Sequence, residues 1–474
     1  VCEKNNVLFI NAFEASKKWY AESAEDLTID GFQLNEAGYK KLALLLADQV
    51  FGKKSTAIES KRAEVYAAVA EKNWIWHTDF KIPNGVHVYG RRYNPFGPDN
   101  YPAEIEKIRQ MTDNREAAIQ ATIKGLSYDL AAADAKTRKL DPVKTNFNPD
   151  KNGSLKYLYG NEALNAIKVA PGYKIELFAS EEEFPNLAKP VQMTFDNKGR
   201  LWVVCMPSYP HYKPGDPKPN DKIIILEDTD KDGKADKETI FAEGLHVPVG
   251  MEITEFGVFV SQGTNLVLLK DTNGDDKADE KKILFTGFGT GDTHAGPSNL
   301  HYGFDNWIWG CVGYSGYKGK VGADSLQFAQ AFFRFKADGS KMEHMTTTSN
   351  NTWGFDFNEA GDVFGSTANN SHGWYMAIPH SYFNAPNTNG SRSTDTHRDM
   401  KPITEKVRQV DAFGGFTAAA GHNFYTARAF PKKYWNSIAF VAEPTGHILH
   451  QNSMQKKGTD FYDKESFNLM AGAD

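Results

Sequence analysis

The sequence predicts a mainly β protein, a β-propeller preceded by an α/β remnant and a helical linker. Of the 474 residues, 13% are aromatic and 40 are glycine, a composition typical of β-strands joined by many turns. From Ala170 onward, an apolar strand, a turn and an aromatic-rich strand recur. The aromatic residues that mark the closing strands are Trp202, Phe259, Trp309, Phe364 and Phe440.

These marker residues recur at intervals that fit the blades of a propeller. Successive markers are 57, 50, 55 and 76 positions apart, and a unit of that length holds about four short strands. A propeller closes on itself, which leaves no sheet edge open. Five units are visible, so we expect about six or seven blades in the complete propeller, with one or two beyond this chain.

The first third of the chain predicts a different organisation. Asn35 fits the N-cap of a helix, because its side chain is a strong acceptor for the first free N–H groups. The predicted elements are a strand at residues 7–13, helices at 36–50, 59–76 and 103–133, and a linker at 139–154. We therefore predict the end of an α/β domain at 1–52, a connecting region at 53–154 and the propeller at 155–474.

An acidic loop occurs twice, 43 positions apart, each time between two short apolar strands. Oxygen-bearing side chains at positions 1, 3, 5 and 9, with the main-chain carbonyl of position 7, resemble the start of an EF-hand calcium loop. The loops therefore predict calcium. The expected ligands are Asp228, Asp230, Asp232, Lys234 (through its carbonyl) and Asp236 in the first copy, and Asp271, Asn273, Asp275 and Asp279 in the second.

Both loops have an alternative interpretation as solvated turns without a metal. Neither has the bidentate Glu that closes an EF-hand loop at position 12, which is Thr239 in the first copy. The second copy also has Asp276 where the turn prefers Gly. Any calcium site is therefore open or completed from elsewhere in the protein.

Composition narrows the range of partners. The net charge is −6 and no strongly basic run occurs, which argues against nucleic acid. No stretch approaches 18 apolar residues, so no membrane-spanning segment is predicted. The three cysteines, Cys2, Cys205 and Cys311, have no metal or haem spacing, and we expect buried free thiols. The chain begins at Val1 without Met, and we expect a fragment whose targeting information lies outside it.

A ring of polar residues opens the predicted inner strands. Propeller ligands usually bind where inner strands meet the central channel, because several blades direct loops to one place. Counting back from the markers gives Lys189, His246, His294, Asn351 and His422 as substrate- or cofactor-binding candidates. The alternative is that these groups, and likewise His301, His372 and Glu443, bond neighbouring blades or buried water.

Several long motifs of the propeller agree with one family. These are 171–179 (PGYKIELFA), 244–250 (GLHVPVG), 413–422 (FGGFTAAAGH) and 440–446 (FVAEPTG). The region closely resembles the propeller of PVC-type haem-binding, membrane-bound dehydrogenase-like proteins, which are similar to quinoprotein glucose and sorbosone dehydrogenases. The resemblance implies a periplasmic, cell-surface or secreted protein that oxidises a sugar or alcohol and passes electrons to a cytochrome c domain or protein. No Cys-x-x-Cys-His motif occurs, so haem is not assigned to this chain.

The same resemblance implies a catalytic base. Residues 291–296 (GDTHAG) resemble the segment that carries the base of the quinoproteins, which makes His294 the candidate base and Asp292 its orienting partner. Asp292 is expected to raise the pKa of His294 and burial to lower it. Pyrroloquinoline quinone is the implied cofactor, although Thr348 to Thr352 stand where those enzymes offer an Arg.

A shorter motif resembles another family. Asp30 to Lys40 is similar to the last block of SGNH (GDSL-like) hydrolases, in which a His serves as the base toward a serine. Gln33 stands at the position of that His and cannot accept the proton, so we expect residues 1–52 to be inactive in ester hydrolysis. A long inserted loop, Ser381 to Asp399, is expected to be functional or to face a partner.

Two functions of different classes remain open at this point. The first is an exported, calcium-stabilised dehydrogenase that uses His294 as the base. The second is a binding module, in which the same polar ring and aromatic residues hold a glycan or a protein and no reaction occurs. Fold alone does not decide between them.

Overall fold

The computed structural model describes most of the chain. The described residues are 2–29, 31–52, 61–80, 82, 85–144, 157–210, 212–348, 350–369, 372–384, 401–402, 418–444 and 446–472. Asp30, most of the predicted linker and most of the inserted loop therefore lie outside them. The chain forms two compact units, Val1–Ile82 with Pro95–Lys144, and Pro83–Asn94 with Thr145–Asp474. The domain boundaries expected from the sequence stay a prediction.

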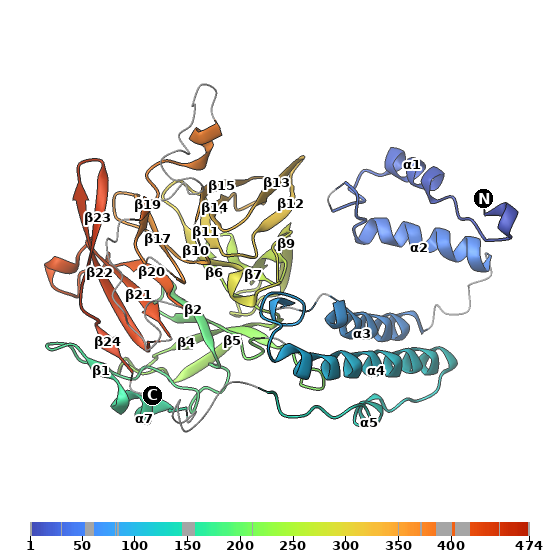
Figure 1. Ribbon diagram of the computed structural model, residues 1–474, viewed down its shortest axis with the longest axis horizontal. Helices are drawn as coiled ribbons and strands as arrows, with labels where there is room; N and C mark the ends of the chain where they lie inside the picture. Colours follow the sequence, from blue (N-terminus) through green and yellow to red (C-terminus); the bar gives the residue numbers. More distant parts are fainter. Residues whose placement is uncertain are drawn as a thin grey trace. The chain divides into compact units, whose positions relative to one another are not determined.

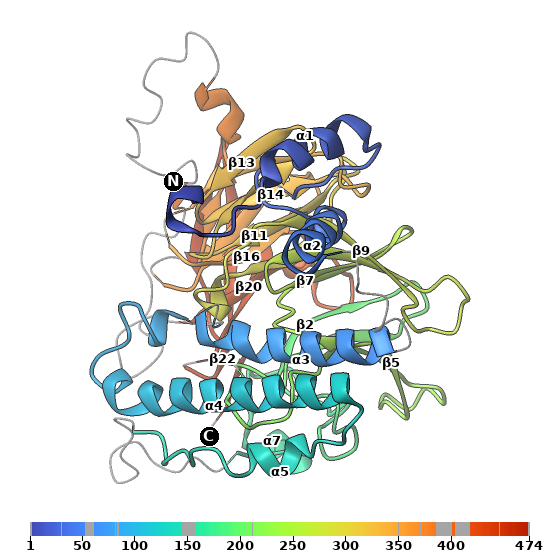
Figure 2. The same ribbon diagram turned by 90° about the vertical axis from the view of Figure 1, so that its right-hand side faces the viewer.

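The first unit is helical. Its elements are η1 (Glu3–Asn5), α1 (Ala12–Glu22), α2 (Glu36–Phe51), α3 (Arg62–Phe80), α4 (Gly97–Lys124) and α5 (Leu130–Asp134). Asn35 caps α2 as predicted, with its Oδ1 accepting from the Gly38 N–H at 3.0 Å. Helices α3 and α4 lie side by side (Figures 1 and 2). Arg115 on α4, nearly buried, pairs with Glu71 on α3 and Asp134 on α5.

Two sequence-based predictions for this unit are wrong. Residues 7–13 form no strand; α1 begins at Ala12 instead, because the Asn11 side chain accepts from the Glu14 N–H and caps a helix there. The helix expected over 103–133 is interrupted, because Gly125 adopts a left-handed conformation (φ +72°) that ends α4. A five-residue helix, α5, follows after the break.

The second unit is built from antiparallel sheets (Figure 1). The first sheet contains β2 (Pro190–Phe195), β3 (Leu201–Cys205), β4 (Asp221–Glu227) and β5 (Lys237–Leu245), and the second contains β6 (Met251–Thr254), β7 (Gly257–Gln262), β8 (Asn265–Lys270) and β9 (Glu280–Thr286). The third contains β10 (Pro297–Tyr302), β11 (Ile308–Val312), β14 (Ala331–Phe335) and β15 (Met342–Thr347), and the fourth β16 (Thr352–Phe357), β17 (Val363–Thr367), β18 (Trp374–Tyr375) and β19 (Lys401–Pro402).

The fifth sheet joins distant parts of the chain. It contains β20 (Ala420–Phe424), β21 (Ile438–Glu443), β22 (Ile448–Lys457) and β24 (Met470–Ala471), with β23 (Asp460–Glu465) beside β22 and β1 (Lys168–Val169) beside β24. A hairpin of β12 (Tyr317–Val321) and β13 (Asp324–Phe328) extends from the third sheet. The short helices of this unit are η3 (Gly85–His87), α7 (Gly160–Ala166), η4 (Thr293–Ala295), η5 (His380–Asn384) and η7 (Lys432–Tyr434).

This arrangement confirms the predicted propeller. Within the described residues, five sheets of up-and-down topology follow one another, and their first strands, β2, β6, β10, β16 and β20, are neighbours in chain order. Each of the five predicted marker aromatics lies in the second strand of its sheet. Cys205 and Cys311 are buried free thiols in equivalent strands, and burial raises the pKa of each thiol to about 12.

Apolar side chains fill the space between successive sheets. Trp202 on β3 packs with Val258 on β7, and Phe259 on β7 packs with Phe335 on β14 at a ring separation of 5.5 Å. Trp309 on β11 stacks on Phe355 of β16 at 5.7 Å. Because both faces of the second strands are buried, these strands are apolar throughout, and they fix the distance between sheets.

Side chains also connect the inner strands, whose backbone groups face the channel and need partners. The Met251 N–H donates to Gln192 Oε1 at 3.0 Å, and the Gln192 amide donates to the Met251 carbonyl at 2.8 Å. Equivalent bonds join each later pair of sheets: Tyr302 N–H to Glu252 at 2.9 Å, Asn299 to the Trp353 carbonyl at 2.8 Å, and Phe424 N–H to Asp356 at 2.7 Å. Each sheet is therefore held in register with the next.

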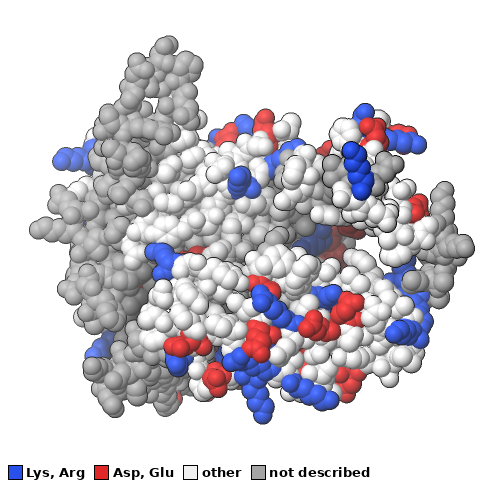
Figure 3. Space-filling model, turned by 45° about the vertical axis from the view of Figure 1, so that its right-hand side comes forward, with Lys and Arg blue, Asp and Glu red and all other residues white. Residues whose placement is uncertain are grey.

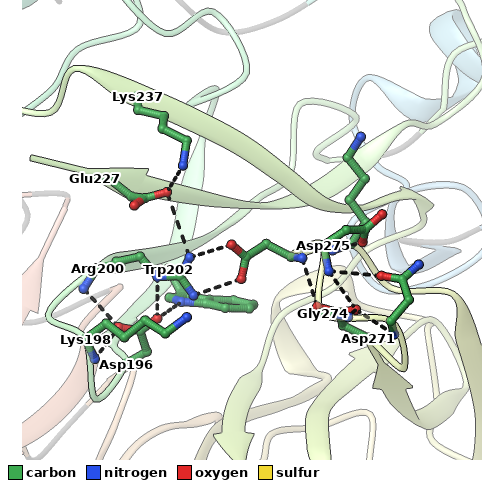
Figure 4. Close-up of polar contacts among 12 residues, drawn as sticks. Asp196, Lys198, Arg200, Trp202, Glu227, Lys237, Asp271, Gly274 and Asp275 are labelled. Atoms are coloured by element: carbon green, nitrogen blue, oxygen red, sulfur yellow. Dashed lines mark hydrogen bonds and ion pairs between the residues drawn. The ribbon is translucent and has the colours of Figure 1, made fainter. Parts of the chain in front are cut away.

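An arginine connects the first two sheets at their outer end (Figure 4). Arg200, in the turn before β3, donates to Asp196 at 2.8 Å and to both carboxylate oxygens of Asp276 at 2.7 and 3.0 Å. The Arg200 and Asp196 side chains are 11% and 8% exposed, so this pair lies largely out of water, whereas Asp276 is half-buried. The bond to Arg200 is the main cause that holds the pKa of Asp276 below its usual range.

The surface carries charges of both signs. On the face shown in Figure 3, Lys and Arg alternate with Asp and Glu over the described residues, and no large patch of one sign appears. None of the described helices combines the length and the apolar character needed to cross a membrane.

We predict that Arg200→Met destabilises the propeller by about 3–5 kcal/mol, because it leaves the nearly buried Asp196 and the half-buried Asp276 without their partner. The measurement is the free energy of unfolding from urea denaturation, followed by the circular dichroism of the sheets. Arg428→Met is the matched control, since Arg428 pairs with Glu359 at 2.6 Å but is 51% exposed, and its loss is expected to cost less than about 1 kcal/mol. Equal effects of the two substitutions would contradict this prediction.

Candidate functional site

The loops that precede the inner strands converge at one end of the sheets. Lys189, which opens β2, donates from Nζ to the carbonyls of Pro207 and Tyr209 at 3.0 and 2.7 Å. Tyr209 packs in one apolar cluster with Val247, from the loop before β6, and with Trp353 of β16. Loops of the first and second sheets and an inner strand of the fourth therefore meet here, whereas a ligand-binding role of the polar ring stays a prediction.

His294 lies in this cluster of loops between two hydrogen-bonding partners. Its Nδ1 is 2.8 Å from Asp292 Oδ1, and the same carboxylate oxygen accepts from the His294 N–H at 3.1 Å. Its Nε2 is hydrogen-bonded to the hydroxyl of Tyr209, and the two rings meet edge to face with centroids 5.1 Å apart. The His294 side chain is 36% exposed and that of Asp292 is 10% exposed. Tyr209, His294 and Asp292 therefore form a hydrogen-bonded chain in which His294 is partly exposed to solvent and Asp292 is nearly buried.

The partners define the proton positions on the imidazole. Asp292 accepts, so Nδ1 carries the hydrogen, and Nε2 is left as the basic nitrogen that receives the Tyr209 O–H. Burial lowers the pKa of His294, and the positive charges of Arg92 and His87 lower it further. The lowering by burial expected from the sequence is therefore present, and burial is its main cause. The imidazole is therefore neutral at pH 7, the form a general base requires.

Asn351 approaches the same loops from the fourth sheet. Its Oδ1 accepts from the Tyr314 N–H at 3.3 Å. A Cβ on Gly313 would lie 1.7 Å from that oxygen, so only glycine fits there. The Gly313 N–H in turn donates to the Ala295 carbonyl at 3.1 Å, next to His294. Asn351 thus reaches the base through the Gly313–Tyr314 turn.

His246 lies at the side of this cluster. Burial lowers the pKa of His246, although nearby Asp221 acts in the opposite direction. Asp221 is completely buried and accepts from the Ser208 N–H, the Ser208 hydroxyl and the Val247 N–H at 2.7 to 3.0 Å. This carboxylate connects the loop that carries Tyr209 to the loop that carries His246, and so fixes their spacing.

His422 does not join the solvent-accessible group. It lies within β20, fully buried, with Nδ1 bonded to the His372 carbonyl at 3.1 Å. The His372 ring is 4.9 Å from that of His450, and both residues are buried. Glu443 is also buried and accepts from the Ala418 N–H at 3.0 Å. These groups form a polar interior between the fourth and fifth sheets, apart from Tyr209 and His294.

His301 faces two carboxylates on the inner strands. Burial raises the pKa of both Glu252 on β6 and Asp356 on β16, whereas the charge of His301 lowers both. The three residues come from successive inner strands. The structure therefore places His301 in the connection between sheets that the sequence left as its alternative role.

We predict that His422 makes the propeller less stable in acid. Burial lowers the pKa of His422 to about 4 from an ordinary value of 6.5, so the unfolded chain binds a proton that the folded chain rejects. Stability is complete above pH 6.5 and falls as the pH drops toward 4, by about 3 kcal/mol.

The measurement is the urea midpoint between pH 7 and pH 4.5. His422→Gln is expected to remove most of the slope, while His77→Gln, at an exposed position of α3, is expected to keep it. An unchanged slope in the His422→Gln protein would show that the histidine does not titrate as described.

The first acidic loop brings three of its predicted ligands together. Carboxylate oxygens of Asp228, Asp230 and Asp236 lie within 4.8 Å of one another. Asp228 also accepts from the N–H groups of Lys231 and Gly233 at 2.6 and 2.9 Å, which curls the loop around it. The Asp232 carboxylate is not part of this group: the Asp232 N–H donates to Asp228 and Asp230 at 3.2 Å, and Asp232 Oδ1 accepts from the Lys234 N–H at 2.8 Å.

The second acidic loop has a similar backbone but a different charge balance. Asp271 accepts from the N–H groups of Asn273 and Gly274 at 3.2 and 2.7 Å, and Asp275 accepts from that of Lys277. Asp276, at the position that prefers glycine, has φ +62°, and its carboxylate accepts from Arg200 at 2.7 Å. Asp279 accepts from Thr272. Arg200 therefore compensates the charge of Asp276, a carboxylate that the first loop does not have because Gly233 stands at that position.

Sequence reasoning missed two contributors to the site. Tyr209 lies 85 positions before His294 in a loop without a recognised motif. The segment 85–93 precedes the whole propeller, yet the Val86 N–H donates to the Gly291 carbonyl at 2.9 Å, next to Asp292. The adjacent Arg91 and Arg92 are the sequence feature that could have indicated a role of this segment in the site.

One family model covers more than half of the chain. It is described as a domain of unknown function, DUF7133, and matches residues 160–474. The chain belongs to the DUF7133 family. The matched region contains all five sheets and His294, whereas segment 85–93 lies before it. No curated protein matches the chain by sequence.

The fold of the DUF7133 region is partly similar to solved propellers. An aldose sugar dehydrogenase of Streptomyces coelicolor with bound PQQ is 14% identical, with 63% of this chain and 84% of that one covered and a TM-score of 0.38. The PQQ domain of pyranose dehydrogenase from Coprinopsis cinerea is 10% identical, with 68% and 89% covered and a TM-score of 0.40. Likenesses at this level carry no argument about activity.

Proposed function

We propose that this DUF7133 propeller is an exported dehydrogenase that oxidises a sugar or alcohol hydroxyl at His294. The observation that carries the proposal is the Tyr209–His294–Asp292 chain, in which a neutral, oriented imidazole stands at the meeting point of three loops. A buried carboxylate that fixes the tautomer and a basic Nε2 directed at a hydroxyl are the parts of a general base.

The residues present define the proton path. Nε2 already receives the Tyr209 O–H, so the phenol oxygen is the atom that meets the substrate hydroxyl. The substrate proton passes to that oxygen as the phenol proton passes to Nε2, and Asp292 stabilises the imidazolium formed. The substrate C–H leaves with two electrons, and the alcohol carbon becomes a carbonyl carbon.

The oxidant of this step has to be a bound cofactor. A quinone of the kind that the sequence resemblance implies would, when bound, supply an acceptor for the hydride. Residues that fit its polar groups are Asn351, at the Gly313 turn, and Lys189, beside Tyr209. We further propose that the electrons leave to a haem of a cytochrome c domain or protein, since no haem motif occurs in the sequence given.

We predict that His294→Ala lowers dye-linked oxidation of sugars or alcohols by roughly 10²–10⁴-fold, the usual contribution of a general base. Tyr209→Phe is expected to lower it less, because Nε2 then faces the substrate directly. The measurement is kcat/KM with and without added quinone, with His77→Gln as the control.

The pH profile gives a second test of the same base. The pKa of His294 is lowered from its ordinary value of 6.5. The rate is therefore expected to remain constant as the pH falls to 6.5, and to decrease only in more acidic solution, where the imidazole becomes protonated. Full activity of the His294→Ala protein would overturn the proposal.

We also propose that the first acidic loop binds calcium. Three carboxylates within 4.8 Å repel one another unless a cation or solvent compensates them, and oxygen ligands of this kind suit calcium. Asp232 and the Lys234 carbonyl would complete the loop. In the second loop Asn273 stands where the first has the carboxylate of Asp230, so a weaker response is expected from Asp271, Asn273, Asp275 and Asp279.

We predict that calcium raises the melting temperature of the protein and that the paired change Asp230→Ala and Asp232→Ala removes this increase. The reason is that a ligand that binds only the folded state stabilises it, and the stabilisation rises with the logarithm of the ligand concentration above Kd. The measurement compares melting temperatures in calcium and in chelator. Asn273→Ala in the second loop is the matched control and is expected to retain the increase. Identical melting temperatures of the parent protein in both buffers would end this proposal.

A second candidate function, a glycan-binding module, is favoured by a hollow of about 700 Å³ on the outer side of the third and fourth sheets. Trp309 and Phe357 line it, and Phe304 and Tyr382 stand exposed at its rim. Aromatic faces beside a few polar groups are common in ligand sites. Sugar binding that survives His294→Ala and is lost in Phe304→Ala would support this candidate.

Two further proposals concern the N-terminal residues and the location of the protein. The resemblance of residues 30–40 to SGNH hydrolases leads us to propose an inactive hydrolase-like remnant, in which Gln33 replaces the base. Export to the periplasm or cell surface is likewise proposed from the resemblance of the propeller.

A further inference from the structure

Segment 85–93 belongs to the same compact unit as the propeller sheets. Its η3 helix is attached by the Val86 N–H to the Gly291 carbonyl at 2.9 Å, in the loop that carries His294. The segment then turns back on itself, with the Arg92 N–H donating to the Val86 carbonyl at 3.1 Å. A Cβ on Gly90 would lie 2.9 Å from Val86 Cα, so glycine is required for this close turn.

The turn presents two arginines beside the base. The Arg91 guanidinium carbon lies 5.6 Å from the centroid of the Tyr314 ring. Tyr314 belongs to the turn that contacts Asn351, and the adjoining Ser315 hydroxyl donates to the Asp292 carbonyl at 3.0 Å. Arg92 is close enough to His294 for its charge to act on the imidazole. Both arginines are therefore grouped around the Tyr209–His294–Asp292 chain.

These charges have no carboxylate partner in the described part of the chain. Both arginine side chains are exposed, and neither forms an ion pair with a described residue. Asp292, the carboxylate nearest the base, is already occupied by the backbone and ring of His294. The mouth of the site is therefore positive, although the whole chain has a net charge of −6.

We infer that the ligand held beside His294 is a small molecule with a carboxylate, and that Arg91 and Arg92 of segment 85–93 bind this group. Arginine is the side chain best suited to a carboxylate, because its planar fork donates two parallel hydrogen bonds. The inference rests on the proposed function for placing the ligand at His294. A sugar acid as substrate and the carboxylated quinone as cofactor share this chemistry.

The test is isothermal titration calorimetry of the full chain with three probes: galacturonate, galactose and pyrroloquinoline quinone. At least one carboxylated probe is expected to bind, galactose is expected to bind at least about tenfold more weakly than galacturonate if the sugar acid is the ligand, and added salt is expected to weaken the binding. The double variant Arg91→Gln with Arg92→Gln is expected to lose about tenfold or more in affinity. Arg428→Gln, at an exposed arginine paired with Glu359, is the matched control.

The possible outcomes distinguish a sugar-acid substrate from a carboxylated quinone, and they distinguish failure of this inference from failure of the proposed function. Arginine-dependent binding of galacturonate identifies the substrate, and arginine-dependent binding of the quinone alone identifies the cofactor. Either result supports the inference, even if His294→Ala retains oxidation and the proposed function fails. Binding of a carboxylated probe is also expected to raise the pKa of His294, measured by NMR titration, because the anion offsets the arginine charges. Carboxylate binding that is unchanged in the double variant, or no binding of either carboxylated probe, overturns the inference.

Discussion

The need to pair the backbone groups of the inner strands is the constraint on which the rest of the propeller depends. These strands have a neighbouring strand on one side only, and an unpaired N–H or carbonyl inside a protein costs about 1–3 kcal/mol. Gln192, Glu252, Asn299 and Asp356 meet this need by bonding to the backbone of the next inner strand. Because each bond fixes the register of one sheet on another, the loops at the ends of the inner strands are brought to one place.

The site depends on this convergence. Tyr209, Asn351 and His294 come from three sheets, and no local structure would bring them together. Two further groups adjust their spacing: Lys189 donates to the carbonyl of Tyr209, and buried Asp221 holds the loops of Tyr209 and His246 with three hydrogen bonds. A buried carboxylate without such bonds would be strongly destabilising. The polar residues around the base therefore stabilise the fold and orient the base at the same time.

The sequence predicted what repeats and what lies close along the chain. The marker aromatics identified all five second strands, Asn35 identified the start of α2, and Asp292 was recognised because it stands two residues from His294. Contacts between distant segments were not predictable: Tyr209 is 85 positions from His294, and Arg200 is 76 positions from Asp276. Asp276 appeared to weaken a calcium loop because its arginine partner could not be identified. Residues 7–13 had an apolar pattern typical of a strand, but Asn11 caps a helix there.

The balance of charge around His294 has a consequence for the chemistry. Asp292, 2.8 Å from Nδ1, favours the imidazolium, whereas burial and the charges of Arg92 and His87 lower the pKa of His294. An anion beside Arg91 and Arg92 would remove part of the opposing charge and leave Asp292 with more influence. The imidazole would then bind a proton more strongly once the ligand is in place than before. The strength of the base is thus coupled to occupancy of the site, since the groups that attract the ligand are the groups that weaken the empty base.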